Sequence, residues 1–255
     1  MGRTNVLSTS DPVVVLVHGA LTDASVWNEV THRLQAGHVP VLAPALPMRS
    51  LEQDAAYLAG IIERIAEPVV LAGHSYAGAV ISHPAVAACD NVAALVYVAA
   101  FQPDAGESVG GLNGRFPGSL LTPDNLRIVP NPLGGEDLTL RPERFAEVYA
   151  ADLDAAHAAV MAASQRPIEP AALGEQLPGE PAWRTLPSWA LVSTRDLSLP
   201  PATLRFMAER AGSRIVEVES SHAAPAAQPA AVTDLILQAF RTVRTVQTAT
   251  DVVSR

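Results

Sequence analysis

Three residues whose types suit nucleophilic catalysis lie far apart in the chain, and each follows a predicted strand. Ser75 stands in Gly-His-Ser-Tyr-Ala-Gly, Asp196 in Ser-Thr-Arg-Asp and His222 in Glu-Ser-Ser-His. A serine hydroxyl is a weak nucleophile at neutral pH, so it needs a base within hydrogen-bond reach and an acid that orients the base. The residue types therefore predict an acyl-transfer site with Ser75 as nucleophile, His222 as base and Asp196 as acid.

The residues around Ser75 are typical of a sharp turn between a strand and a helix. Such a turn strains the backbone of its central residue and needs small residues two positions before and after it. Gly73 and Ala77 meet that need, although the usual pattern has glycine at both places. His74 precedes the nucleophile, and its side chain should point away from Ser75. The competing interpretation, a serine that only caps the following helix, leaves Asp196 and His222 unexplained.

Two backbone N–H groups are candidates for stabilising negative charge on a substrate oxygen. The N–H of Tyr76 should begin the helix after the nucleophile. Ala20 follows His18-Gly19 in the turn after the first strand, where glycine lets the backbone approach a substrate closely. We therefore expect an oxyanion hole formed by the N–H groups of Ala20 and Tyr76.

The assignment of the acid and the base has alternatives. Asp104 also follows a predicted strand, so it is a rival to Asp196 as the acid. Asp196 could instead be a carboxylate that caps its own loop, and His222 could be an ordinary histidine of a surface loop. The order serine, aspartate, histidine along the chain favours the catalytic interpretation.

Strands and helices alternate along most of the chain and must position these residues. Apolar runs predict strands at 12–17, 39–46, 68–73, 93–98, 189–192 and 215–218, and helical spacing predicts helices at 26–34, 51–65, 80–89, 202–211 and 231–243. This alternation predicts an α/β fold with a mostly parallel central sheet flanked by helices. Prolines at 40, 44 and 47 indicate that the second strand is short and near an edge. Binding sites in such sheets lie at the carboxyl ends of the strands.

The alternation stops between residues 104 and 183. Prolines and glycines interrupt this stretch, no strong strand is visible in it, and its best-defined part is a helical stripe over 141–165. We expect residues 1–103 and 184–255 to form the core and residues 104–183 to form a helical cap, or lid, inserted into it.

Composition narrows the possible partners. The 255 residues include 17 arginines, no lysine and 26 acids, for a net charge of -9. This balance argues against nucleic acid and anionic membranes, because both are bound through basic surfaces. No metal-ligand spacing or phosphate-binding loop is present, so we expect no metal and no cofactor. The chain has a single cysteine and no long apolar segment, so we expect a soluble cytoplasmic protein. A homodimer is a further possibility that the sequence leaves open.

Taken together, these motifs resemble the α/β-hydrolase superfamily, over about residues 12–243. The resemblance rests on His18-Gly-Ala20 with Trp27 downstream, on the Ser75 turn, and on the Asp196 and His222 loops. Within the superfamily the chain is most similar to the small members related to plant methylesterases and hydroxynitrile lyases and to their bacterial esterase relatives. That resemblance implies a two-step acyl transfer through an acyl-enzyme, with the 104–183 insertion as the cap that sets the substrate.

The expected activity is a cofactor-independent serine esterase that hydrolyses a small or medium, largely apolar carboxylic ester or lactone. The apolar preference comes from the aliphatic residues of 104–183. One alternative is a hydroxynitrile-lyase-like or C–C bond-cleaving enzyme, although those lyases use a cap lysine and this chain has none. Another alternative is a non-catalytic ligand-binding homologue. The chemically competent residues at all three catalytic positions argue against it.

Overall fold

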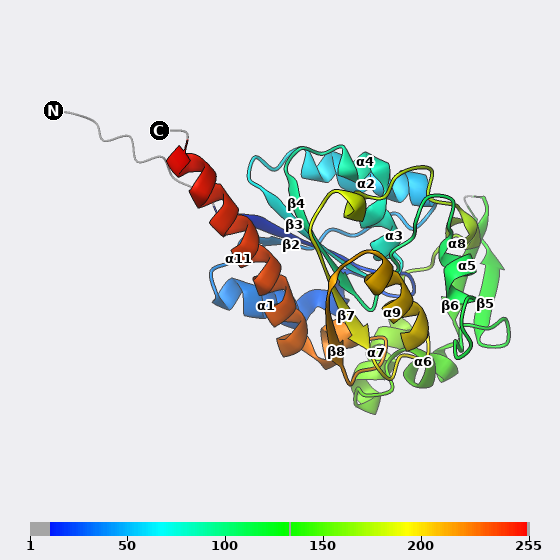
Figure 1. Cartoon of the computed structure of the whole chain (residues 1–255). Coiled ribbons are helices and arrows are strands. Elements are labelled where there is room, and N and C mark those ends of the chain that lie inside the picture. The colour runs from blue at the N-terminus through cyan, green and yellow to red at the C-terminus, as the bar shows by residue number, and fades with distance from the viewer. Residues whose placement is uncertain (1–10, 133, 254–255) are drawn as a thin grey trace.

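A six-stranded parallel sheet forms the centre of the computed structural model, which describes residues 11–132 and 134–253 and side chains as far as residue 245 (Figure 1). In sheet order the strands are β2 Val41–Leu42, β1 Val13–Val17, β3 Val69–His74, β4 Val92–Val98, β7 Ser188–Ser193 and β8 Arg214–Val218. The six predicted strands are therefore all present, and neighbouring strands run parallel.

The burial of each strand follows from its place in the sheet. Every residue of β3 is buried, because strands on both sides and helices on both faces cover it. The edge strand β2 has two residues only. Pro40 and Pro44 flank it, and a proline has no N–H to donate to a ladder, so the prediction of a short edge strand is confirmed.

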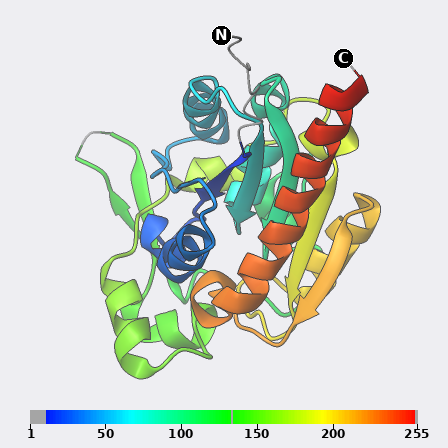
Figure 2. The ribbon, with the colours of Figure 1, turned by 90° about the vertical axis from the view of Figure 1, so that its left-hand side faces the viewer.

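Helices cover both faces of the sheet. In Figure 2, α1 (Asn28–Ala36) and α11 (Pro229–Val253) lie together over one face. The opposite face carries α2 Leu51–Ile62, α3 Ala77–Ser82, α4 Pro84–Ala87 and α9 Pro201–Arg210. Short elements, a 3₁₀ turn Ala24–Trp27 and α10 Ala224–Ala227, precede α1 and α11. None of the helices in the described ranges combines the length and the apolar character that crossing a membrane requires.

Two predicted helices of the core differ strongly from the structure, and the helix predicted at 51–65 ends earlier, at Ile62. The predicted helix 80–89 is two helices, because His83 precedes a proline and adopts an extended backbone with ψ of 141°. The residue before a proline is sterically disfavoured in helical conformation, and Pro84 then begins α4. The closing helix begins at Pro229 and continues to Val253, beyond the predicted end at residue 243.

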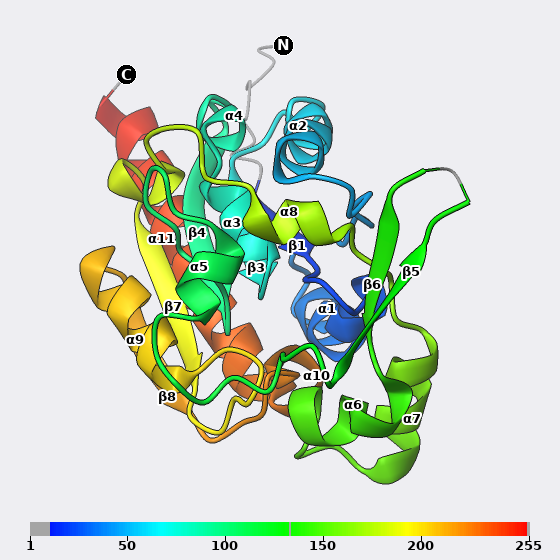
Figure 3. The ribbon, with the colours of Figure 1, turned by 90° about the vertical axis from the view of Figure 1, so that its right-hand side faces the viewer.

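The 104–183 segment connects β4 to its sheet neighbour β7. Figure 3 shows its elements on one side of the molecule. They are α5 Val109–Asn113, β5 Leu126–Pro130, β6 Glu136–Leu140, α6 Pro142–Tyr149, α7 Ala155–Ala163, α8 Pro170–Gly174 and a 3₁₀ turn Ala182–Arg184.

Two expectations about this segment were wrong. Strands β5 and β6 form an antiparallel hairpin where no strong strand was expected. Its signals are weak, because each strand has five residues and only Leu138 and Leu140 give a buried alternation. The stripe over 141–165 is two helices, since α6 ends at Tyr149 and the Asp154 side chain caps α7 by accepting the N–H of His157 at 2.9 Å.

Candidate active site

Ser75 lies in a strained turn between β3 and α3. Its φ is +54°, in the left-handed region that side chains other than glycine rarely adopt. The turn is held by neighbours, since the Ser75 N–H donates to the Val98 carbonyl and the Ser75 carbonyl accepts from the N–H of Phe101. A Cβ atom on Gly78 would lie within 3.0 Å of the Phe101 backbone, so this position must be glycine for the turn to pack against the end of β4.

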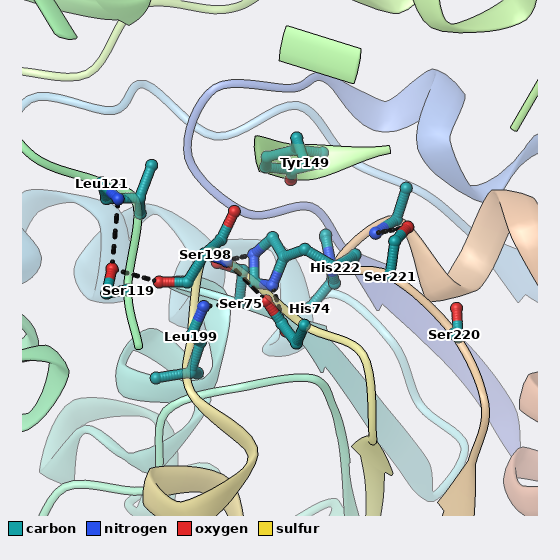
Figure 4. Close-up of polar contacts among 12 residues, drawn as sticks. His74, Ser75, Ser119, Leu121, Tyr149, Ser198, Leu199, Ser220, Ser221 and His222 are labelled. Atoms are coloured by element: carbon teal, nitrogen blue, oxygen red, sulfur yellow. Dashed lines mark hydrogen bonds and ion pairs between the residues drawn. The ribbon is translucent and has the colours of Figure 1, made fainter. Parts of the chain in front are cut away.

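The three side chains singled out in the sequence form one hydrogen-bonded chain. Ser75 Oγ lies 2.8 Å from His222 Nε2, and Figure 4 shows these two residues side by side. His222 Nδ1 lies 2.6 Å from Asp196 Oδ2. All three residues are buried, with exposed fractions of 6% for Ser75, 2% for Asp196 and 1% for His222. Such an arrangement can transfer the serine proton to the imidazole while the carboxylate fixes which ring nitrogen carries the other proton.

The second oxygen of Asp196 fixes the carboxylate in place. Asp196 Oδ1 accepts the backbone N–H groups of Ser198 and Leu199, both at 2.8 Å. The rival acid Asp104 does not bond to His222. Its carboxylate pairs instead with the guanidinium of Arg184. The structure therefore brings Asp196, and not Asp104, to the histidine.

Ala20 and Tyr76, whose backbone N–H groups are the expected donors, line the same cavity as Ser75. Neither N–H forms a hydrogen bond with any residue that the structure describes, so both can donate to a ligand. His18 fixes the turn before Ala20: its Nδ1 donates to the Gly19 carbonyl at 2.9 Å, and its Nε2 accepts the Leu46 N–H at 3.0 Å. Burial lowers the pKa of His18, which favours the neutral ring that this acceptor role requires.

Two buried groups lie next to the site: Asp54, which the sequence analysis missed, and His74, whose contact with the His222 loop it did not foresee. The Asp54 carboxylate accepts the hydroxyl of Tyr76 at 2.9 Å and the N–H of Met48 at 2.8 Å, and burial raises the pKa of Asp54. His74 Nε2 donates to the carbonyl of His222 at 2.8 Å, with the two ring centroids 5.0 Å apart. No local signal in the sequence marks Asp54, which has the position of a surface acid in the first turn of α2, whereas His74 was considered only in relation to Ser75.

An apolar cavity opens above the serine, with about 730 Å³ of empty space when its mouth is included. Nine residues of the cavity wall come from the 104–183 segment or the loop after β4: Phe101, Val109, Gly110, Asn113, Leu121, Leu126, Leu138, Tyr149 and Leu173. Ala20, Leu21, Tyr76 and His222 complete the wall around Ser75. A mostly apolar wall with a few polar groups is typical of sites that bind small organic molecules. Within the described ranges, no three His, Cys, Asp or Glu side chains gather in a way that could hold a metal ion.

Comparison with known proteins identifies the family. The model of the alpha/beta hydrolase family matches residues 14–235, which is most of the chain. The chain belongs to the alpha/beta hydrolase family. Among curated proteins, this alpha/beta hydrolase is 33% identical over 93 residues to "Lipase LipV" of Mycobacterium tuberculosis (strain ATCC 25618 / H37Rv). That match covers 32% of this chain and spans about a third, 35%, of the lipase's length.

Several solved structures share the fold of this alpha/beta hydrolase. Polyneuridine aldehyde esterase is 20% identical with a TM-score of 0.76, covering 90% of this chain and 99% of that one. A pyrethroid hydrolase from Sphingobium faniae JZ-2 is 24% identical with a TM-score of 0.73, covering 91% and 98%. The methylesterase protein MES16 from Arabidopsis is 17% identical with a TM-score of 0.75, covering 91% and 99%. At these identities the likeness shows the fold, and the α/β-hydrolase fold expected from the sequence is thereby confirmed.

Proposed function

We propose that this alpha/beta hydrolase is a carboxylic ester hydrolase that works through an acyl-enzyme on Ser75. The observation that carries the proposal is the buried, continuous chain from Ser75 Oγ through His222 to Asp196, of which Ser75 and His222 line an apolar cavity. The names of the relatives, an esterase, a pyrethroid hydrolase, a methylesterase and a lipase, support the same class of reaction.

In the first half of the proposed reaction, Ser75 Oγ attacks the carbonyl carbon of the ester while His222 Nε2 accepts the serine proton. The charge on the carbonyl oxygen is stabilised by the N–H groups of Ala20 and Tyr76, which have no other acceptor among the described residues. Asp196 stabilises the imidazolium that forms. The tetrahedral intermediate then expels the alkoxide, which takes the proton from His222 and leaves as the alcohol.

In the second half, a water molecule gives a proton to His222 Nε2 and attacks the acyl carbon. The intermediate collapses, Ser75 Oγ leaves and takes the proton back, and the carboxylic acid is released. Both halves use the same nucleophile, base, acid and donors, and the ester and one water molecule are the only reactants consumed.

The wall of the cavity indicates the substrate. Its side chains are mostly aliphatic or aromatic, and the hydroxyl groups of its two tyrosines are directed to Ala20 and Asp54. We therefore propose a small or medium, largely apolar carboxylic ester or lactone. In this proposal residues 104–183 act as the cap that selects the substrate, because most of the apolar wall comes from them.

The test combines a fluorophosphonate probe with a short-chain aromatic ester. We expect the wild-type protein to be labelled on Ser75 and to hydrolyse the ester, and both activities to be lost in Ser75→Ala and nearly lost in His222→Ala. Ser164→Ala, which removes a hydroxyl bonded only within the end of α7, is the control and should behave as wild type. Failure of the wild-type protein to react with the probe and with the ester would overturn the proposal in favour of a ligand-binding role.

A further inference from the structure

The end of α6 contacts the three loops that carry Ala20, Asp196 and His222. We call residues 148–152 the α6 terminus: the last two residues of the helix and the start of the turn to α7. The last carbonyl groups of a helix have no partner within the helix and need one elsewhere. Here the Val148 carbonyl accepts the Ser198 hydroxyl at 2.8 Å, and the Tyr149 carbonyl accepts the N–H of Ala223 at 2.9 Å. One helix end therefore bonds to both the Asp196 loop and the His222 loop.

Asp152 adds a carboxylate to the contact with the His222 loop. Its oxygens accept the Ser221 N–H at 2.9 Å and the Ser220 hydroxyl at 3.1 Å, and they also accept the Ser221 hydroxyl. Ser220 and Ser221 are almost completely buried. Together with the bond to Ala223, these contacts fix the backbone immediately before and immediately after His222.

The side chain of Tyr149 reaches the remaining parts of the site. Its ring meets the His222 ring edge-on, with centroids 4.7 Å apart, and stacks on Phe145 behind it at 5.0 Å. Its hydroxyl donates to the carbonyl of Ala20 at 3.3 Å. The same residue therefore contacts the imidazole directly and bonds to the turn that contains Ala20.

We propose that the α6 terminus is a positioning element for the catalytic groups, a role that rests on the function proposed above. Ala20, Asp196 and His222 come from three separate loops. The Asp196 and His222 loops also bond directly to each other, through the Arg195 N–H and the Ser220 carbonyl at 3.1 Å, whereas the α6 terminus connects both of them to the Ala20 turn. A shift of about 1 Å in a reacting group can lower a rate about 100-fold. Because the α6 terminus bonds to all three loops at once, it holds the distances among them. Only the Tyr149 side chain also reaches the site itself, where it contacts the His222 ring and lines the cavity.

The experiment compares Asp152→Ala with the matched control Asp154→Ala. Asp154 lies two residues further along the same turn, and its side chain accepts the His157 N–H and contacts none of the three loops. We expect Asp152→Ala to lower kcat about 10- to 100-fold with little change in KM. Asp154→Ala should lower the melting temperature through loss of a helix cap, with the kcat of wild type at temperatures well below that transition.

A second readout does not depend on turnover. Amide hydrogen exchange at Ser221 and Ala223 should be faster in Asp152→Ala than in wild type and unchanged in Asp154→Ala. Asp152→Asn keeps one carbonyl oxygen for the Ser221 N–H, so its effects should be intermediate, and it serves if the alanine variant does not fold.

Two results would overturn the inference: wild-type kcat and exchange in Asp152→Ala, or an equal loss of kcat in Asp154→Ala. A wild-type protein that neither hydrolyses esters nor reacts with the probe would instead refute the proposed function. The exchange rates at Ser221 and Ala223 would still decide whether the α6 terminus holds the histidine loop.

Discussion

Replacement of Asp196 by asparagine should trap His222 in the wrong tautomer. Asp196 Oδ1 accepts two backbone N–H groups, from Ser198 and Leu199. In the variant only the amide oxygen can occupy that place, since an NH₂ group there would face two donors. The NH₂ group must then face His222 Nδ1 and donate to it. The proton of the ring therefore moves to Nε2, which faces Ser75 Oγ and can no longer accept the serine proton.

The size of the effect follows from losing the base while keeping the fold. The two loop hydrogen bonds survive in Asp196→Asn, so the melting temperature should change little. A wrong tautomer in a serine, histidine and aspartate site lowers kcat about 10⁴-fold, which corresponds to about 5.4 kcal/mol of activation free energy. The assay is kcat on a short-chain aromatic ester together with the rate of fluorophosphonate labelling, and both should fall in parallel.

The control is Asp104→Asn, which removes the partner of Arg184 at a partly exposed position. A surface ion pair contributes at most about 1 kcal/mol to stability, and this one lies away from the cavity, so kcat should match wild type. The reasoning is refuted if Asp196→Asn keeps more than about a tenth of the wild-type kcat, or if Asp104→Asn is the variant that loses it.

Two further predictions concern stability. A Cβ on Gly78 would collide with the Phe101 backbone, so Gly78→Ala should destabilise the fold by about 3 kcal/mol or more. Gly60 lies in α2 with open space around it, so Gly60→Ala should stabilise the fold by about 0.5 to 1 kcal/mol. Urea unfolding monitored by circular dichroism measures both free energies, and equal stability of the two variants would contradict this prediction. Burial holds the pKa of His74 well below its usual value. Below about pH 6.5 the unfolded chain therefore binds a proton at this residue that the folded chain does not. As the pH is lowered, His74 should reduce the unfolding free energy by about 1.4 kcal/mol per pH unit. Unfolding free energies between pH 5 and 7 should show a shallower slope in His74→Gln and an unchanged slope in the exposed-site control His157→Gln, and identical slopes in all three proteins would count against the burial argument.

The sequence was sufficient to predict the core of the fold because its signals there are strong and local. Buried parallel strands such as β3 are continuous apolar runs, and the small residues around Ser75 mark the turn that follows. The loops with Asp196 and His222 could be placed because parallel strands bring their carboxyl ends to one edge. The fold is confirmed by the family match, whereas the catalytic roles of these residues stay predictions until the variants are measured.

The 104–183 segment shows where such reasoning fails. The β5–β6 hairpin depends on pairing between two five-residue strands whose individual patterns are weak, so the sequence favoured no strand. The contacts of Asp152 with Ser220 and Ser221 join residues nearly seventy positions apart. No periodicity or motif encodes a contact of that kind, because it depends on how the segment folds back over the sheet. Asp54 was missed for a similar reason, since its partner Tyr76 lies on another element.

At Ser75, the proposed catalytic activity and the stability of the fold make opposite demands on the residue type, because its backbone is left-handed. Glycine would adopt a φ of +54° without strain, yet it would remove the hydroxyl. A laboratory selection that rewards heat resistance alone would therefore favour an inert protein at this site. Directed evolution of this enzyme should screen for turnover in every round and seek added stability away from the turn, for example along the exposed sides of its helices.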